Sequence, residues 1–164
     1  MSHHYKAIVI GTSLTGKTTL MRYLRKTSNL QIQEIDEELT QLNGGHWPKD
    51  DNYKNSVLVP KIKKNVLSHD NILFFTNAHY FSALDLEIAR QKDFKIIQLF
   101  VDKEELERRN KNRMENEGYE DHSQWFDSML QYQKDIKDKG LVDKVIETNK
   151  PVEEIAQDLA CYIQ

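Results

Sequence analysis

Short apolar runs alternate along this chain with longer segments in which apolar residues recur at intervals of three or four. The short runs are typical of buried strands and predict strands at 6–10, 30–35, 72–75, 94–101 and 142–146. Strands that alternate with helices favour a parallel sheet with helices on both faces. The pattern therefore predicts an α/β fold.

The longer segments predict helices at 16–26, 37–41, 55–68, 82–92, 103–116 and 123–139, and a last helix that begins near Pro151. Pro60 argues for a break, or for a first-turn position, within the third of these helices. The polar stretch 46–53 has too little periodicity for a regular element.

Composition narrows the class of protein. The chain has 164 residues, 38% hydrophobic and 30% charged, and a net charge of −3 with both signs interspersed. This length predicts one domain spanning 1–164. No apolar run is long enough for a membrane span. The slightly negative, evenly mixed charge argues against a general nucleic-acid-binding surface. The polar start and the single cysteine, Cys161, favour a cytoplasmic protein.

The segment between the first strand and the first helix carries the most specific motif. Its residues 11–18, GTSLTGKT, match G-x-x-x-x-G-K-[ST] and are called the glycine loop here. In this context the backbone amides and the helix N-terminus form a phosphate cradle. Lys17 is expected to reach the β- and γ-phosphates, and the Thr18 hydroxyl to complete a Mg²⁺ shell. We therefore expect ATP and Mg²⁺ to bind, with contacts from Gly11, Thr12, Ser13, Leu14, Thr15, Gly16, Lys17, Thr18 and Thr19.

Two carboxylates follow at the end of the second predicted strand. Glu34 and Asp36 are two residues apart, so on a strand they point to the same side. Ligands of open α/β sheets bind beyond the carboxyl ends of the strands. The pair is therefore a candidate for orienting Mg²⁺ or for accepting a proton from an attacking hydroxyl. The alternative is that both are solvated and that Asp36 only caps the next helix.

Three arginines lie on the helix after the fourth predicted strand. Arg109 and Arg113 are four residues apart and share a face, next to Arg108. Arginines that close over a nucleotide stabilise charge on the transferring phosphoryl group. The alternative is a solvated helix with local acidic partners.

The third predicted strand ends in Thr76 and Asn77, without the acidic residue that many related nucleotide-binding sites carry there. Asn77, His79 and Tyr80 are candidates for contacts with an acceptor. A plain loop is an equal alternative for His79 and Tyr80.

The order of these features resembles that of small-molecule kinases of the adenylate, shikimate and gluconate kinase type, within the P-loop NTPases. The resemblance spans nearly the whole chain and rests on the glycine loop, on EIDEEL at 34–39, on 97–113 and on 145–155. It implies a three-layer α/β/α domain with a five-stranded parallel sheet of order 2-3-1-4-5.

The resemblance also implies roles for particular positions. Glu34 and Asp36 would contact a metal-bound water and the acceptor hydroxyl. Arg109 and Arg113 would lie at the start of a mobile lid, at about 108–124. The insertion at about 39–67 would bind the acceptor. The loop that borders the adenine would comprise Thr148, Asn149, Lys150 and Pro151.

The acceptor region departs from that of nucleotide kinases, because no arginine occurs between Leu39 and Ile72. A nucleotide phosphate is held best by bidentate arginine contacts. We therefore expect an uncharged or hydroxyl-bearing acceptor, in a pocket lined by His46, Trp47, Tyr53, Asn77, His79 and Tyr80. For Trp47, packing within the insertion is an equal alternative.

Together these observations predict transfer of the ATP γ-phosphoryl group to a small-molecule hydroxyl, with Lys17, Asp36, Arg109 and Arg113 as catalytic residues. The alternatives are a nucleoside, nucleotide or polynucleotide 5′-hydroxyl kinase, and a regulatory ATPase that acts as a nucleotide-dependent switch. The protein is expected to be a monomer or a homodimer.

Overall fold

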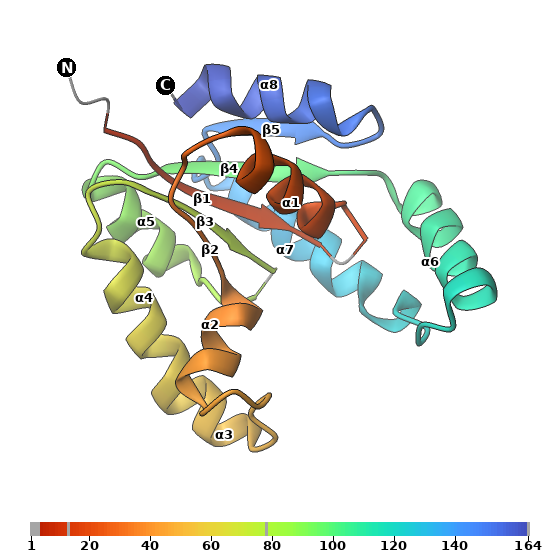
Figure 1. The fold of residues 1–164 in the computed structure, drawn as a ribbon, viewed down its shortest axis with the longest axis horizontal. Coiled ribbons are helices and arrows are strands. Elements are labelled where there is room, and N and C mark those ends of the chain that lie inside the picture. The colour runs from red at the N-terminus through yellow and green to blue at the C-terminus, as the bar shows by residue number, and fades with distance from the viewer. Residues whose placement is uncertain (1–3, 13, 78, 164) are drawn as a thin grey trace.

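Five parallel strands form one sheet in the order β2-β3-β1-β4-β5 (Figure 1). The computed structural model describes residues 4–12, 14–77 and 79–163. The strands are β1 (Lys6–Gly11), β2 (Ile32–Glu34), β3 (Ile72–Thr76), β4 (Lys95–Phe100) and β5 (Lys144–Glu147). The predicted strand order and the parallel sheet are confirmed.

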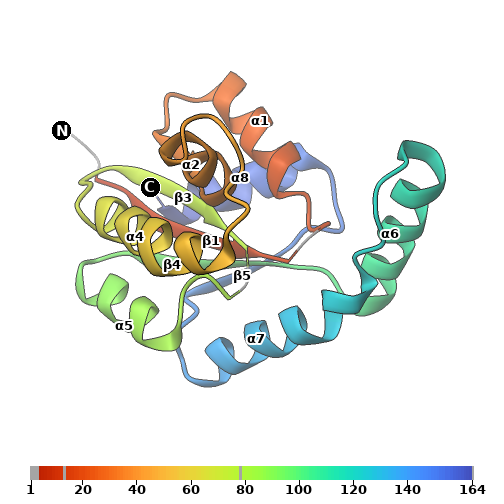
Figure 2. The ribbon, with the colours of Figure 1, turned by 90° about the horizontal axis from the view of Figure 1, so that it is seen from below.

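Helices cover both faces of this sheet (Figure 2). The helix α1 (Lys17–Thr27) and the C-terminal α8 (Val152–Ile163) pack against one face. The other face is covered by α2 (Ile35–Leu42), α4 (Val59–Leu67), α5 (Ala83–Gln91) and α7 (Phe126–Asp138). The result is the expected three-layer α/β/α arrangement.

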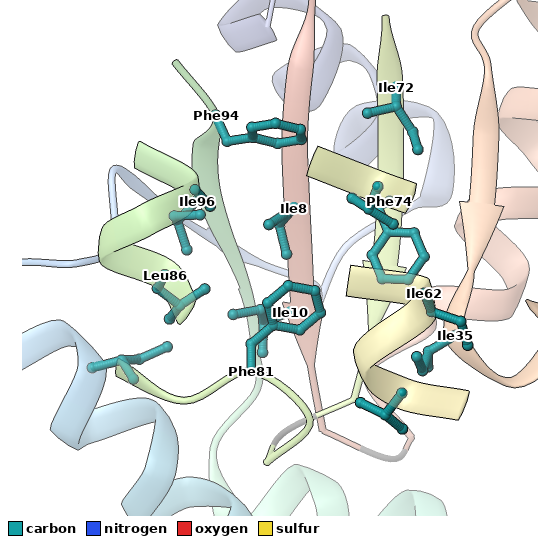
Figure 3. Close-up of a cluster of buried hydrophobic side chains, with 14 of the residues drawn as sticks. Ile8, Ile10, Ile35, Ile62, Ile72, Phe74, Phe81, Leu86, Phe94 and Ile96 are labelled. Carbon is teal, nitrogen blue, oxygen red and sulfur yellow. The ribbon is translucent and has the colours of Figure 1, made fainter. Parts of the chain in front are cut away.

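The central strand β1 supplies side chains to the two cores alternately, because successive strand residues point to opposite faces. Ile8 and Ile10 belong to the core under α4 and α5, where Phe74 and Phe81 lie beside them (Figure 3). Other β1 residues, such as Val9, belong to the core under α1 and α8. All of these side chains are at most 1% exposed, so β1 is buried on both faces and fixes the position of the loop that follows it.

The region after β2 differs from the expectation in two ways. The second strand ends at Glu34, and Ile35 already begins α2, because the Glu34 carboxylate caps that helix. The stretch expected to be irregular contains the short α3 (Asp51–Tyr53), capped by the side chain of Asp50.

A π-helical segment, Lys54–Leu58, joins α3 to α4. Pro60, in the first turn of α4 as one of the expected alternatives, has no N–H with which to bond back to the preceding turn. The wider turn accommodates this, with the Val59 N–H donating to the Lys54 carbonyl.

The long helix α6 (Lys103–Glu117) projects beyond the carboxyl end of β4 (Figures 1 and 2). It returns to α7 through a turn and a short 3₁₀ segment, Ser123–Trp125. A separate small core of Val101, Leu106, Phe126 and Met129 anchors α6 and α7. Within the described residues, no helix is long and apolar enough to span a bilayer.

Candidate active site

The glycine loop lies at the carboxyl end of the central strand β1 and leads into α1. A Cβ atom on Gly11 would lie 2.6 Å from the Thr15 hydroxyl oxygen, so no larger residue fits without a shift of the loop. Gly16 caps α1 with a φ of 86°, which glycine adopts without steric cost. Both glycines are therefore required by the path of the backbone. Ser13 lies outside the described residues.

Lys17 is half-buried, and its ammonium group is surrounded by acceptors. Its Nζ donates to the carbonyl oxygen of Gly11 at 2.9 Å and to Oδ1 of Asn77 at 2.5 Å. Burial lowers the pKa of Lys17 from 10.5 to about 8, and the negative charges of Asp36 and Glu34 oppose this shift. The cation is therefore held in position by the protein at a desolvation cost.

Asn77 connects Lys17 with Asp36. Besides accepting from Lys17, its side chain hydrogen-bonds the Asp36 carboxylate. Burial raises the pKa of Asp36, while Lys17, the Asn77 bond and Lys54 act in the opposite direction. A carboxylate with a raised pKa is a stronger base than a solvated one. Residues from β1–α1, α2 and the end of β3 thus meet at one point.

The two carboxylates do not have the geometry expected of neighbouring strand positions. Glu34 ends β2, and its carboxylate accepts the backbone N–H groups of Asp36 and Glu37, each at 2.9 Å. Asp36 lies in the first turn of α2, so the expectation that both side chains project from a strand is wrong. Glu34 is the helix cap, a role that the sequence had suggested for Asp36.

One cleft of about 940 Å³ is lined by seven of the fourteen residues expected to contact the nucleotide, while Gly11 and Thr15 of the glycine loop are not among its lining residues. Its lining combines the glycine loop, the end of β3 and one side of α6. The lining residues are Thr12, Leu14, Gly16, Lys17, Thr18, Thr19, Met21, Arg22, Glu34, Asp36, Asn77, Arg108, Arg109, Asn112, Arg113, Glu117, Tyr119 and His122.

Six of these residues were not predicted: Met21, Arg22, Asn112, Glu117, Tyr119 and His122. Helical spacing was a usable signal for two of them. Arg22 follows Thr18 by four residues on α1, and Asn112 follows Arg109 by three on α6, so each shares a face with a predicted residue. Tyr119 and His122 reach the cleft only because the chain turns back after α6.

Arg109 and Arg113 both line the cleft, in different environments. Arg109 donates from Nη1 to the Leu14 carbonyl at 2.8 Å and from Nη2 to the Thr148 carbonyl at 3.1 Å. The guanidinium of Arg113 lies 3.8 Å from the centre of the Tyr119 ring. Arg109 therefore joins the wall of the site, whereas Arg113 stacks near its rim.

The loop expected to border the adenine meets the site through Thr148, whose carbonyl accepts from Arg109. None of Thr148, Asn149, Lys150 and Pro151 is among the lining residues of the cleft. Lys150 instead pairs with Asp158 of α8.

Of the expected acceptor residues, Asp36 and Asn77 line the cleft and the others do not. Trp47 is 45% exposed, and Lys54 lies over its ring and over that of Tyr80, 5.4 and 5.8 Å from the ring centres. His79 turns toward α7, where Nε2 lies 2.9 Å from the Ser128 hydroxyl. His46 and Tyr53 are exposed on the insertion side.

The side-chain oxygens in the cleft are suited to Mg²⁺, and they are too few for a metal that is coordinated by protein side chains alone. In the described part of the chain, no three His, Cys, Asp or Glu side chains form a metal-binding group. The cleft does contain the Thr18 hydroxyl and the carboxylates of Glu34 and Asp36. Mg²⁺ commonly takes one or two such oxygens and completes its shell with water and phosphate oxygens.

Comparison with known proteins identifies the fold. No protein-family model matches the chain. No curated protein matches it either. A shikimate kinase from Aquifex aeolicus vf5 superposes with a TM-score of 0.71 at 17% identity, covering 96% of this chain and 94% of that one. A shikimate kinase from Acinetobacter baumannii, solved in complex with shikimate, gives 0.71 at 16% identity, covering 98% and 93%. A gluconokinase from Sinorhizobium meliloti 1021 gives 0.63 at 16%, covering 99% and 95%. The chain shares the fold of these kinases.

Proposed function

We propose that this protein transfers the γ-phosphoryl group of ATP to a hydroxyl group of a small molecule. The observation that carries the proposal is the single cleft in which the glycine loop, Asp36 and the arginines of α6 converge. Phosphoryl transfer needs little covalent chemistry from the protein, so positioning and charge are the requirements that such a site must meet. The structural similarity to two shikimate kinases and a gluconokinase supports the proposal.

On the nucleotide side, the amides of the glycine loop and Lys17 hold the phosphates and stabilise the charge that develops during transfer. Mg²⁺ held by Thr18, with Glu34 or Asp36 acting directly or through water, would neutralise charge on the β- and γ-phosphates. Arg113 supplies a further cation from the rim of the cleft, while Arg109 fixes the α6 wall to the glycine loop. In this proposal residues 108–124 form a lid that excludes water. The segment 148–151 would border the adenine.

On the acceptor side, Asp36 orients the hydroxyl and accepts its proton. Its raised pKa suits this task, because a buried carboxylate is the better base. Asn77 lies between Asp36 and Lys17 and would keep the base and the phosphate-binding cation in register. The insertion at 39–67 would cover the acceptor, with His46, Trp47, Tyr53, His79 and Tyr80 within or near its walls.

The test combines an acceptor screen with one substitution. ATP consumption is measured against pooled sugars, hydroxy acids, nucleosides and nucleotides, and the active pool is resolved. Asp36→Asn should then lower kcat by about a hundredfold or more, the scale of a lost general base, with ATP affinity nearly unchanged. Glu38→Gln is a matched control, since Glu38 lies in the same first turn of α2 and does not line the cleft.

Two results would contradict the proposal. Unchanged turnover in Asp36→Asn would show that Asp36 is not the general base. Tight ATP binding without acceptor-dependent turnover in any pool would favour a nucleotide-dependent switch.

A further inference from the structure

Glu105, in the first turn of α6, holds two arginines of the cleft with one carboxylate. Its Oε1 accepts from Arg108 Nη2 at 2.6 Å and from Arg109 Nε at 3.0 Å, and its Oε2 accepts from Arg108 Nε at 2.9 Å. The Glu105 side chain is only 14% exposed. The bonds from Arg108, followed by those from Arg109, lower the pKa of Glu105 to about 2, so the carboxylate is ionised at any working pH.

Arg109 extends this contact to two loops that are distant in sequence. It uses Nε for Glu105, Nη1 for the Leu14 carbonyl and Nη2 for the Thr148 carbonyl. All three nitrogens of the guanidinium are therefore engaged, and the plane of the group is fixed by three partners. This planar fork is a geometry that lysine does not reproduce.

The contact with Leu14 matters because Leu14 has a φ of 70°, in the left-handed region that is sparsely populated by residues other than glycine. Such a conformation persists only when the surroundings hold it. The Leu14 side chain packs against the small core of α6 and α7, and its carbonyl is held by Arg109. The glycine loop is thus anchored to α6 at a residue with a left-handed backbone conformation.

We propose that Glu105 is a positioning residue for the nucleotide site, which acts by holding Arg109 so that the glycine loop and the 148–151 segment keep a fixed spacing. The inference rests on the proposed function only in that the cleft binds a nucleotide. Without the carboxylate, the adjacent guanidiniums of Arg108 and Arg109 repel each other and Arg109 loses one of its three anchors. The Leu14 carbonyl then loses its fixed donor, and the loop amides are no longer preorganised for phosphate.

The test uses the full chain and the non-hydrolysable probe AMP-PNP with Mg²⁺, so that no acceptor is needed. Glu105→Gln should weaken binding by about tenfold, within the range measured for residues coupled in one network. Glu104→Gln is the matched control, because Glu104 is an exposed acid in the same first turn of α6 and its removal has the same effect on the helix dipole. Its affinity should stay within about twofold of the parent protein.

A double-mutant cycle separates positioning from general stability. If Glu105 acts through Arg109, the variant carrying both Glu105→Gln and Arg109→Gln should bind no more weakly than Arg109→Gln alone. Glu105→Asp, which keeps the charge, should retain more affinity than Glu105→Gln and serves if the latter is poorly folded. In turnover, KM for ATP should rise while kcat at saturating ATP changes by less than about threefold.

Additive losses in the cycle, or equal affinities of Glu105→Gln and Glu104→Gln, would overturn the assignment. These outcomes are independent of the acceptor. A protein that binds the probe but phosphorylates nothing would contradict the proposed function and leave the Glu105 measurements fully interpretable.

Discussion

In the nucleotide-free protein, Lys17 is expected to destabilise the fold near neutral pH and to stop doing so in alkaline solution. The unfolded chain keeps the ordinary lysine pKa of 10.5, whereas burial lowers it to about 8 in the folded protein. Between these values the unfolded chain holds a proton that the folded protein has lost. The unfolded state therefore binds more protons, and the free energy of unfolding rises with pH across this window.

The magnitude follows from the two pKa values. A gap between 10.5 and about 8 corresponds to about 3 kcal/mol at 1.36 kcal/mol per pH unit. The window is not complete at about pH 10, so about 2 kcal/mol of this cost should be recovered between about pH 7 and about pH 10. Binding of phosphate or Mg²⁺ would change the charge around Lys17. The measurement is therefore made without nucleotide, in a buffer that contains a metal chelator.

The assay is urea unfolding of the parent protein and of Lys17→Met at a series of pH values. Other groups titrate in this range in both proteins, so the difference between the two free energies isolates Lys17. Lys17→Met should be the more stable protein at about pH 7, and its advantage should shrink by about 2 kcal/mol by about pH 10. An advantage that does not change with pH would refute the idea that Lys17 is held charged at a desolvation cost.

Two further predictions concern the backbone of the site. Gly11→Ala places a Cβ 2.6 Å from the Thr15 hydroxyl, so the free energy of unfolding should fall by about 1–3 kcal/mol, and binding of ATP, measured by calorimetry, should weaken by at least about tenfold. A variant that binds ATP normally would contradict the close approach. Glu34→Ala removes the α2 cap and should destabilise the protein by about 1 kcal/mol in urea, with or without Mg²⁺. A loss confined to Mg²⁺-containing solution would indicate a metal ligand rather than a cap.

The fold was predictable because its signals are local. The strand at 72–75 is a continuous apolar run, and the structure extends it by one residue to Thr76. The glycine loop combines a specific spacing with a strand before it and a helix after it. Neither inference requires knowledge of a distant contact, and the family resemblance then supplied the strand order.

The positions of individual side chains in the site were not predictable. They depend on contacts between residues distant in sequence, or on a residue type that is uncommon at its position. Glu34 caps α2, although Ser, Thr, Asp and Asn are the residues preferred at that position, so nothing marked the end of the strand. The bond from Arg109 to Thr148 joins residues 39 apart in sequence. His79 has a φ of 79° and turns toward α7, which a pattern of polar residues does not indicate.

The central position of β1 also constrains the order in which the protein can be assembled on the ribosome. The strand that precedes the glycine loop is made before both of its neighbours in the sheet, β3 at Ile72–Thr76 and β4 at Lys95–Phe100. Its apolar residues stay without sheet partners until those strands have emerged. The Arg109 anchor is complete only after Thr148 has been added. The cleft is therefore completed late in folding, although the motif of its glycine loop begins at residue 11, and chains that end before Thr148 should lack the Arg109 anchor.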